Sequence, residues 1–96
     1  MDKKIIEYTR LFPVVTQLRI TNSNRKTKRF RADFVMNGQH RVVHFGLKNA
    51  QTYFDGASKK KRDSYLARAS KIKNKKGEYT HSQPGTANSF AYHILW

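Results

Sequence analysis

Four consecutive cations, Lys59-Lys60-Lys61-Arg62, carry the clearest chemical signal in this sequence, because they coincide with the expected start of a helix. Ser58 is a typical N-cap residue, which places these side chains in the first helical turn. A helix N-terminus carries about half a positive charge, so exposed cations there are unfavourable by ~0.3–1 kcal/mol each. A bound anion such as phosphate would reverse that penalty. The alternative is a solvated helix end whose repulsion is screened by salt.

A second group of cations lies on the loop and strand that open a predicted hairpin. With His40 and His44 on the same face of the hairpin, this group could form a strip that follows a nucleic-acid backbone, which gives affinity without sequence specificity. A flexible charged loop is the alternative. Together with Arg68 and Lys71, the two groups give the candidate anion-binding residues: Arg25, Lys26, Lys28, Arg29, Arg31, Lys59, Lys60, Lys61, Arg62, Arg68 and Lys71.

Other kinds of chemistry have little support in the residue spacing. His40 and His44 are four positions apart on one predicted strand, so their α-carbons lie ~13 Å apart and cannot share a metal ion without a bend. The chain has no cysteine, and no two carboxylates have the spacing of a metal-dependent nuclease. A small metal-free ribonuclease is a minor alternative, which would need His81 or His93 as acid and base. We expect a protein with no enzymatic activity, no metal and no cofactor.

The elements that must position these side chains begin with a hairpin. Asn37-Gly38 separates two alternating segments, 28–36 and 39–45, and supplies the positive φ values that a type I′ turn needs. A two-residue loop fixes the register. The predicted cross-strand pairs are Phe30 with Phe45, Ala32 with Val43, and Phe34 with Arg41. One face is then apolar, and the other carries Arg29, Arg31, Asp33, His40, Val42 and His44.

The remaining elements complete an α+β fold. Residues 14–20 alternate as a strand, with Val14 and Leu18 on one face and Val15 on the other. A helix is expected from Ser58 to about Ile72, with an apolar stripe of Tyr65, Leu66, Ala69 and Ile72. Strands followed by helices favour a three-stranded antiparallel sheet with two or three helices packed on one face. The expected core is Phe30, Phe34, Phe45, Leu66, Phe90 and Leu95.

The C-terminal stretch 77–96 contains no Lys or Arg. Thr86 is expected to cap a last helix whose apolar residues follow helical spacing: Ala87, Phe90, Ala91, Ile94 and Leu95. This helix should cover the apolar face of the hairpin. A docking role for its end is the alternative, because Trp96 follows Ile94-Leu95 and tryptophan is favoured at interface centres. The tyrosines and Trp96 could also stack on bases, although most of them fit the core or its rim.

Composition limits the class of protein. Ninety-six residues fit one small domain, residues 1–96, and 38% hydrophobic content is too high for a disordered tail. Twenty Lys and Arg against six Asp and Glu give a formal charge of +14, and fourteen of these cations fall within residues 25–31 and 59–76. Such uneven charge indicates a polyanionic partner, with nucleic acid the first candidate. No apolar run approaches the ~18 residues of a membrane span, and the N-terminus lacks signal-peptide character, so we expect a protein that is not secreted.

Several short motifs carry a resemblance to a known family. They are Val43-His44-Phe45-Gly46, Tyr53-Phe54, the helix segment 61–68, Pro84-Gly85 and the closing Leu95-Trp96. Over roughly residues 42–96 the chain resembles small basic uncharacterised proteins of nucleocytoplasmic large DNA viruses and some algae. The positions that match the family pattern are His44, Gly46, Tyr65 and Arg68. The resemblance implies a viral context, in a virion or in a virus factory inside the host cell.

Two hypotheses about function follow from charge and resemblance together. The first is a virion-associated protein that binds nucleic acid, DNA or RNA, through its Lys and Arg clusters without strong sequence specificity. The second is a minor capsid protein that cements the capsid lattice through contacts with acidic capsid or virion proteins.

Overall fold

The predicted hairpin is present with the predicted register. In the computed structural model, which describes residues 1–96, strand β2 (Lys28–Met36) pairs antiparallel with β3 (Gln39–Leu47). Asn37 and Gly38 form the turn with φ values of 54° and 74°, as a type I′ turn requires. The three predicted cross-strand pairs are confirmed: Phe30 with Phe45, Ala32 with Val43, and Phe34 with Arg41.

Strand β1 (Thr16–Asn22) completes a three-stranded sheet in the order β1-β2-β3, but it departs from the predicted alternation. Its pairing with β2 shifts at Gln17, which has a φ of 53°. Such a β-bulge inserts one residue and re-aims the side chains around it. Val15 is therefore buried, whereas Val14 is half exposed. Val15, not Val14, thus shares the core face with Leu18. The predicted assignment of Val14, rather than Val15, to the face of Leu18 was wrong because strict alternation does not continue through a bulge.

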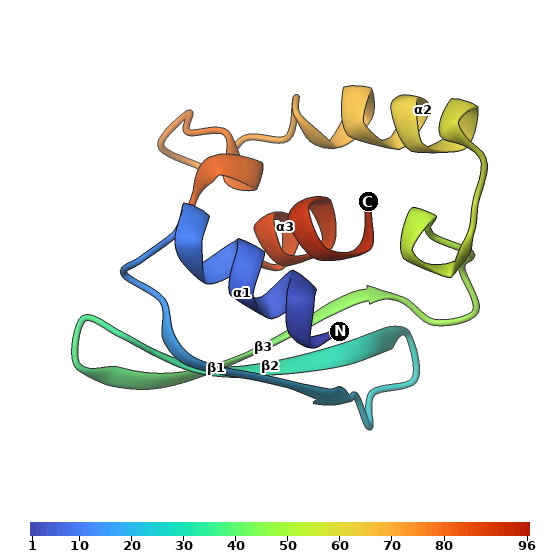
Figure 1. The fold of residues 1–96 in the computed structure, drawn as a ribbon. Coiled ribbons are helices and arrows are strands. Elements are labelled where there is room, and N and C mark those ends of the chain that lie inside the picture. The colour runs from blue at the N-terminus through green and yellow to red at the C-terminus, as the bar shows by residue number, and fades with distance from the viewer.

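The C-terminal segment forms the core on the inner face of the sheet. The Thr86 hydroxyl accepts a hydrogen bond of 3.1 Å from the Ser89 N–H, so Thr86 caps helix α3 (Ala87–Phe90) as predicted. The chain continues as a π-helix, η3 (Ala91–Leu95). Figure 1 shows this segment between the sheet and the second long helix. Within this segment, Ser89, Phe90, Ile94 and Leu95 each have no more than 1% of their surface exposed.

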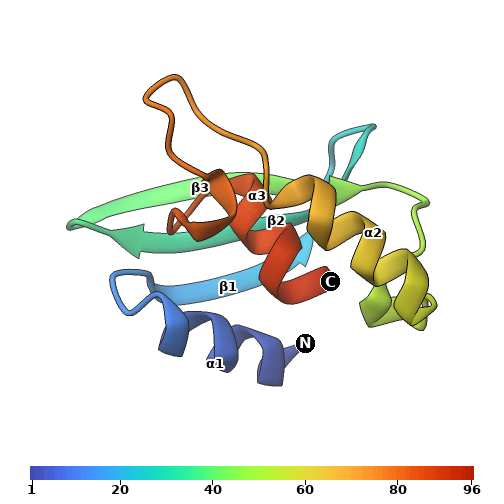
Figure 2. The ribbon, with the colours of Figure 1, turned by 90° about the horizontal axis from the view of Figure 1, so that it is seen from above.

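Helix α1 (Asp2–Leu11) was not predicted, and it covers the other half of the same sheet face (Figures 1 and 2). Its one buried residue is Tyr8. The Tyr8 ring stacks on Phe90 with centroids 4.7 Å apart, and its hydroxyl lies 2.7 Å from the Ser89 hydroxyl. Met1, Ile5, Tyr8 and Phe12 follow helical spacing, and Met1 and Phe12 pack against the core, so the sequence carried a signal for this helix that the prediction missed.

Helix α2 (Lys59–Ala69) lies outside the C-terminal segment, on the side away from the sheet (Figure 1). It ends three residues before the predicted Ile72, which is half exposed. The predicted core residues Phe30 and Leu66 are only partly buried. Two short 3-10 turns flank this helix, η1 (Tyr53–Asp55) and η2 (Thr80–Ser82). The sheet and helices together confirm the predicted α+β class.

Candidate nucleic-acid interface

Most of the positive charge has no carboxylate beside it. Ion pairs within 4.0 Å engage four of the twenty Lys and Arg residues, so the other sixteen have no acidic partner. The paired cations are Lys4, Arg29, Arg31 and Arg62. Three of these four, Arg29, Arg31 and Arg62, belong to the predicted anion-binding residues. Their charge is partly neutralised, whereas the other predicted residues have no acidic partner.

Arg29 is held by an acid from another element. Its guanidinium donates two hydrogen bonds to Asp55, at 2.5 and 2.6 Å. The same carboxylate accepts hydrogen bonds from the Thr52 N–H at 3.0 Å and from the Thr52 hydroxyl at 2.8 Å. The Arg29 bonds, followed by the Thr52 N–H bond, hold the pKa of Asp55 well below its usual range. Arg29 thus ties η1 to the sheet, a role that its sequence position did not indicate.

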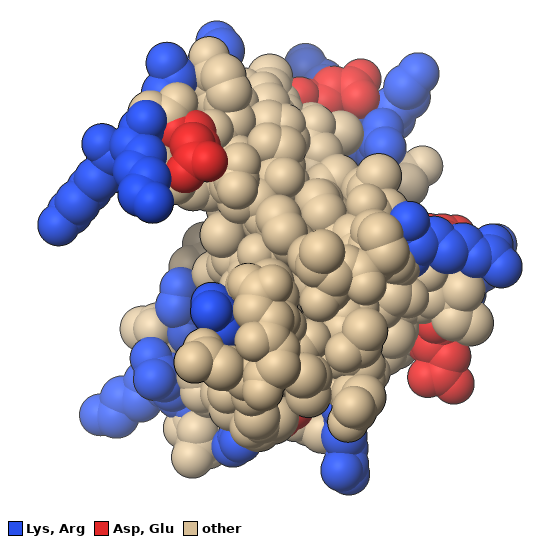
Figure 3. Space-filling view, turned by 90° about the vertical axis from the view of Figure 1, so that its left-hand side faces the viewer, with Lys and Arg blue, Asp and Glu red and all other residues tan.

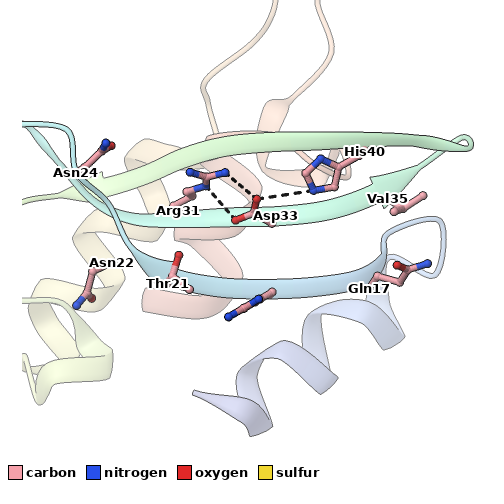
Figure 4. Close-up of a pocket in the computed structure, with 9 residues that line it drawn as sticks. Gln17, Thr21, Asn22, Asn24, Arg31, Asp33, Val35 and His40 are labelled. Carbon is pink, nitrogen blue, oxygen red and sulfur yellow. Dashed lines mark hydrogen bonds and ion pairs between the residues drawn. The ribbon is translucent and has the colours of Figure 1, made fainter.

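Arg31 lies in a polar hollow on the outer face of the sheet. Its guanidinium donates two 3.0 Å hydrogen bonds to Asp33, and the His40 Nε2 lies 3.7 Å from the same carboxylate. Figure 4 shows both side chains turned toward Asp33. The hollow has a volume of about 570 Å³ and is also lined by Arg19 and by amide and hydroxyl side chains of β1 and the following loop. Asp33 offsets part of the charge that the predicted strip would present there.

The loop between β1 and β2 is fastened to the sheet while its cations stay exposed. The Ser23 hydroxyl lies 2.7 Å from His44 Nδ1 and accepts a hydrogen bond of 3.1 Å from the Arg25 N–H. Partial burial, followed by the charges of Arg25 and Arg31, lowers the pKa of His44. This shift favours the neutral form of His44. Arg25 and Lys26 remain exposed and without carboxylate partners.

The start of α2 has the predicted geometry. The Ser58 hydroxyl accepts a hydrogen bond of 3.2 Å from the Lys61 N–H, which confirms Ser58 as the N-cap. Lys59, Lys60 and Lys61 are exposed, and the first turn contains no acidic residue. Three exposed lysines therefore lie within one turn of the positive end of the helix dipole.

Arg62, the fourth cation of this run, turns away from the others. Its Nε donates a 2.9 Å hydrogen bond to the Trp96 carbonyl, and its guanidinium lies 5.1 Å from the centre of the Tyr53 ring. Arg62 is half-buried and connects α2 with the end of the C-terminal segment. Its side chain is therefore engaged by Trp96, Tyr53 and Asp63 and is less available to a ligand than the three lysines.

One groove brings cations from both sequence clusters together. Lys28 from the first residue of β2, Lys61 from the first turn of α2 and Arg68 from its last turn all line it. Figure 1 shows the end of β3, η1 and the start of α2 at this same end of the molecule. Tyr65 and Trp96, whose rings stack with centroids 4.4 Å apart, line the groove as well. We call this feature the basic groove. The spacing of residues in the sequence could not show that Lys28 and Lys61 lie together. Within the sequence, the single tryptophan, Trp96, was the residue that pointed to a binding surface here.

Other cations do not line this groove. Lys71 is exposed just beyond the end of α2. The following loop is closed by the Asn74 carboxamide, whose oxygen accepts from the Lys76 and Glu78 N–H groups at 2.9 and 3.0 Å. Figure 3, which faces the opposite end of the molecule from η1, shows Lys and Arg around the periphery and an uncharged centre. The unpaired cations are thus distributed over several surfaces.

The histidines are divided among separate environments. His93 Nε2 lies 3.0 Å from the His81 carbonyl oxygen, and burial lowers the pKa of His93. The His81 Nδ1 is buried without a hydrogen-bond partner. His40 and His44 contact different residues, as described above. No three His, Asp or Glu side chains are placed to hold a metal ion.

These features define a small α+β fold with a large excess of unpaired cations. None of its helices is both long and apolar enough for a membrane span. The chain belongs to a protein family of unknown function, DUF5754, which matches residues 18–69, from β1 to the end of α2. It is 38% identical over 95 residues to the uncharacterized protein L851 of Acanthamoeba polyphaga mimivirus, a match that covers 98% of this chain and 94% of that protein. No solved structure matches. The expected membership of an uncharacterised viral family is confirmed.

Proposed function

We propose that this viral protein is a non-enzymatic polyanion-binding protein that binds nucleic acid by charge, without strong sequence specificity. The observation that carries this proposal is the set of sixteen Lys and Arg residues that have no carboxylate partner. Concentrating this charge in a small domain raises its self-repulsion, which a bound polyanion relieves. Each phosphate that a Lys or Arg neutralises also releases condensed counterions, which favours binding.

The three exposed lysines at the start of α2 are the first candidates for phosphate contact. Lys59, Lys60 and Lys61 share this position with the positive end of the helix dipole, where a phosphate would interact with both. Arg25 and Lys26 on the β1–β2 loop add a second exposed pair. Contacts of this kind position a protein on a nucleic-acid backbone and carry no sequence information.

Salt dependence of binding to mixed-sequence duplex tests this proposal. If six or more phosphates are neutralised, affinity falls ~10³-fold or more between about 50 and 200 mM salt. A filter-binding titration measures it, with the triple variant Lys59→Gln, Lys60→Gln, Lys61→Gln expected to flatten the slope. Weak binding with a flat salt dependence would contradict the proposal.

A minor capsid protein that cements a capsid lattice is the second candidate. The observation that favours it is a set of half-exposed apolar side chains on α1 and the turn after it, which are Ile6, Leu11 and Val14. Apolar side chains of this kind are candidates for protein–protein contact. This candidate predicts that the protein stays with capsid shells stripped of genome, whereas recovery with released nucleic acid alone would count against it.

A further inference from the structure

We propose that the basic groove binds an unstacked nucleobase together with its phosphate, so that the protein prefers single-stranded nucleic acid. This inference rests on the proposed function and adds to it the form of nucleic acid recognised. The groove has a volume of about 470 Å³, within the ~300–1,000 Å³ typical of small-molecule sites. No Asp or Glu lines it.

The walls of the groove combine apolar and aromatic surface. Tyr65 and Trp96 stack almost in parallel, at an interplanar angle of 12°, Leu47 adds exposed aliphatic surface, and the buried Ala91 and Leu95 lie at the base of the groove. Leu95 is buried and belongs to the core cluster, so this part of the groove rests on the core. Planar aromatic side chains are the usual platforms for unpaired bases, because every base presents a π-face.

The aromatic pair is held in place before any ligand arrives. The Arg62 Nε donates to the Trp96 carbonyl at 2.9 Å, and the Arg62 guanidinium packs over Tyr53. Trp96 is thereby fixed through its backbone as well as through the Tyr65 ring. A binding surface that is already ordered loses less conformational entropy when a ligand binds.

Three cations complete the match to a nucleotide. Lys28, Lys61 and Arg68 come from different turns or elements, and none of them is within ion-pair distance of a carboxylate. A base that stacks in the groove would therefore place its phosphate among unpaired positive charges. Bases of a duplex are already paired and stacked on each other, so a single strand can supply this ligand and an intact duplex cannot.

The single tryptophan of the chain makes the groove observable. We expect oligothymidylate of about 12 nucleotides, within the usual site size of single-strand binders, to quench Trp96 fluorescence. Thymidine monophosphate at higher concentration should quench it too, because the base itself occupies the groove. Inorganic polyphosphate should bind without this quenching. Equal quenching by polyphosphate would overturn the inference, since it would show an anion site without base stacking.

Matched variants on β3 separate the groove from general charge. Leu47 lines the groove and is 65% exposed, whereas Val42 is 41% exposed and pairs with Asp33 of the outer face. Leu47→Glu and Val42→Glu change net charge equally. A carboxylate at position 47 would pair with the groove cations and repel the phosphate, so the base could not stack. We therefore expect Leu47→Glu to lower the ratio of single-strand to duplex affinity by up to roughly 5- to 150-fold, the range for losing one base–aromatic stack. Val42→Glu should leave the ratio within about twofold.

A second pair keeps the test decisive if a glutamate variant fails to fold. Arg68→Gln removes a cation of the groove and Lys71→Gln removes one outside it, and both positions are exposed on or beside α2. Only Arg68→Gln should lower the single-strand preference. Equal effects within both pairs would overturn the groove but leave the proposed function intact if the salt dependence is steep. Absence of binding to either single strand or duplex would overturn the proposed function as well.

Discussion

The Arg29–Asp55 ion pair leads to a prediction that separates stability from binding. Arg29 lies in a basic cluster, yet both of its terminal nitrogens are bonded to Asp55. The side chains of Arg29 and Asp55 each keep 26% of their surface exposed. We therefore expect Arg29→Gln to destabilise the fold while having little effect on nucleic-acid affinity. Arg25→Gln, which removes an exposed cation of the same cluster, should weaken nucleic-acid binding and have little effect on the stability of the fold.

The expected magnitude follows from the geometry of the pair. Hydrogen bonds to charged groups contribute ~1.5–3 kcal/mol each, whereas exposed ion pairs contribute ~0–1 kcal/mol. This pair is bidentate but partly solvated, so solvent screening places its net contribution at about 1–2 kcal/mol. For a domain of this size, a loss of that order lowers Tm by roughly 4–16 °C.

The pH dependence of the pair gives an independent check. The pKa of Asp55 is lowered in the folded protein from its ordinary value of 3.8. A group with a depressed folded pKa contributes stability that is present above its unfolded pKa and is lost as pH falls toward the folded pKa. The difference in unfolding free energy between the parent protein and Asp55→Asn should therefore be full at pH 7 and shrink below about pH 4.

Urea unfolding at pH 7 and at pH 3, followed by circular dichroism, measures both effects, and filter binding at fixed salt measures affinity. Arg25→Gln is the matched control, because it removes the same charge from the same cluster. The reasoning is refuted if Arg29→Gln leaves the unfolding free energy unchanged and weakens nucleic-acid binding as much as Arg25→Gln does.

Three further predictions concern the core and the histidines. Tyr8→Phe should cost about 2 kcal/mol in urea unfolding, because the buried hydroxyl bonds the Ser89 hydroxyl and accepts from the Gly85 N–H at 3.0 Å; an unchanged midpoint would contradict this. Gly85→Ala should cost at least ~2 kcal/mol, because Gly85 has a φ of 78° and a Cβ there would lie 3.1 Å from the Phe34 ring. A Tm within the error of the parent protein would argue against that packing. No RNA cleavage is expected at stoichiometric protein; cleavage abolished by His93→Ala would instead favour a ribonuclease.

Local sequence rules predicted the elements whose geometry depends on neighbouring residues. Asn37-Gly38 sets the turn, and the two-residue loop then determines every cross-strand pair of the hairpin. Ser58 and Thr86 were identified as helix caps because a cap bonds an N–H three residues ahead. The buried positions of the C-terminal segment follow from helical spacing.

Local rules of this kind fail where a contact between distant residues determines the structure. Gln17 adopts a positive φ within β1, and this bulge reverses the facing predicted for Val14 and Val15. Helix α1 is held by Tyr8, whose bonded partner Ser89 is 81 residues away. A bulge leaves no periodic pattern along the chain. Met1, Ile5, Tyr8 and Phe12 do follow helical spacing, but that spacing does not show which distant residue anchors the helix.

The candidate site shows the same division. The sequence by itself determined how much positive charge this protein carries and which segments hold it. It also showed that one of these segments begins a helix whose first turn has no acidic residue. Composition and helix caps are local properties, so neighbouring residues are enough to predict them. Only the tertiary structure decided which cations are available. It engages Arg29 with Asp55 and Arg62 with Trp96, and it gathers Lys28 and Lys61 into one groove. The physical reason is that ion pairing and groove formation depend on distances between elements, which the packing of helices on the sheet sets.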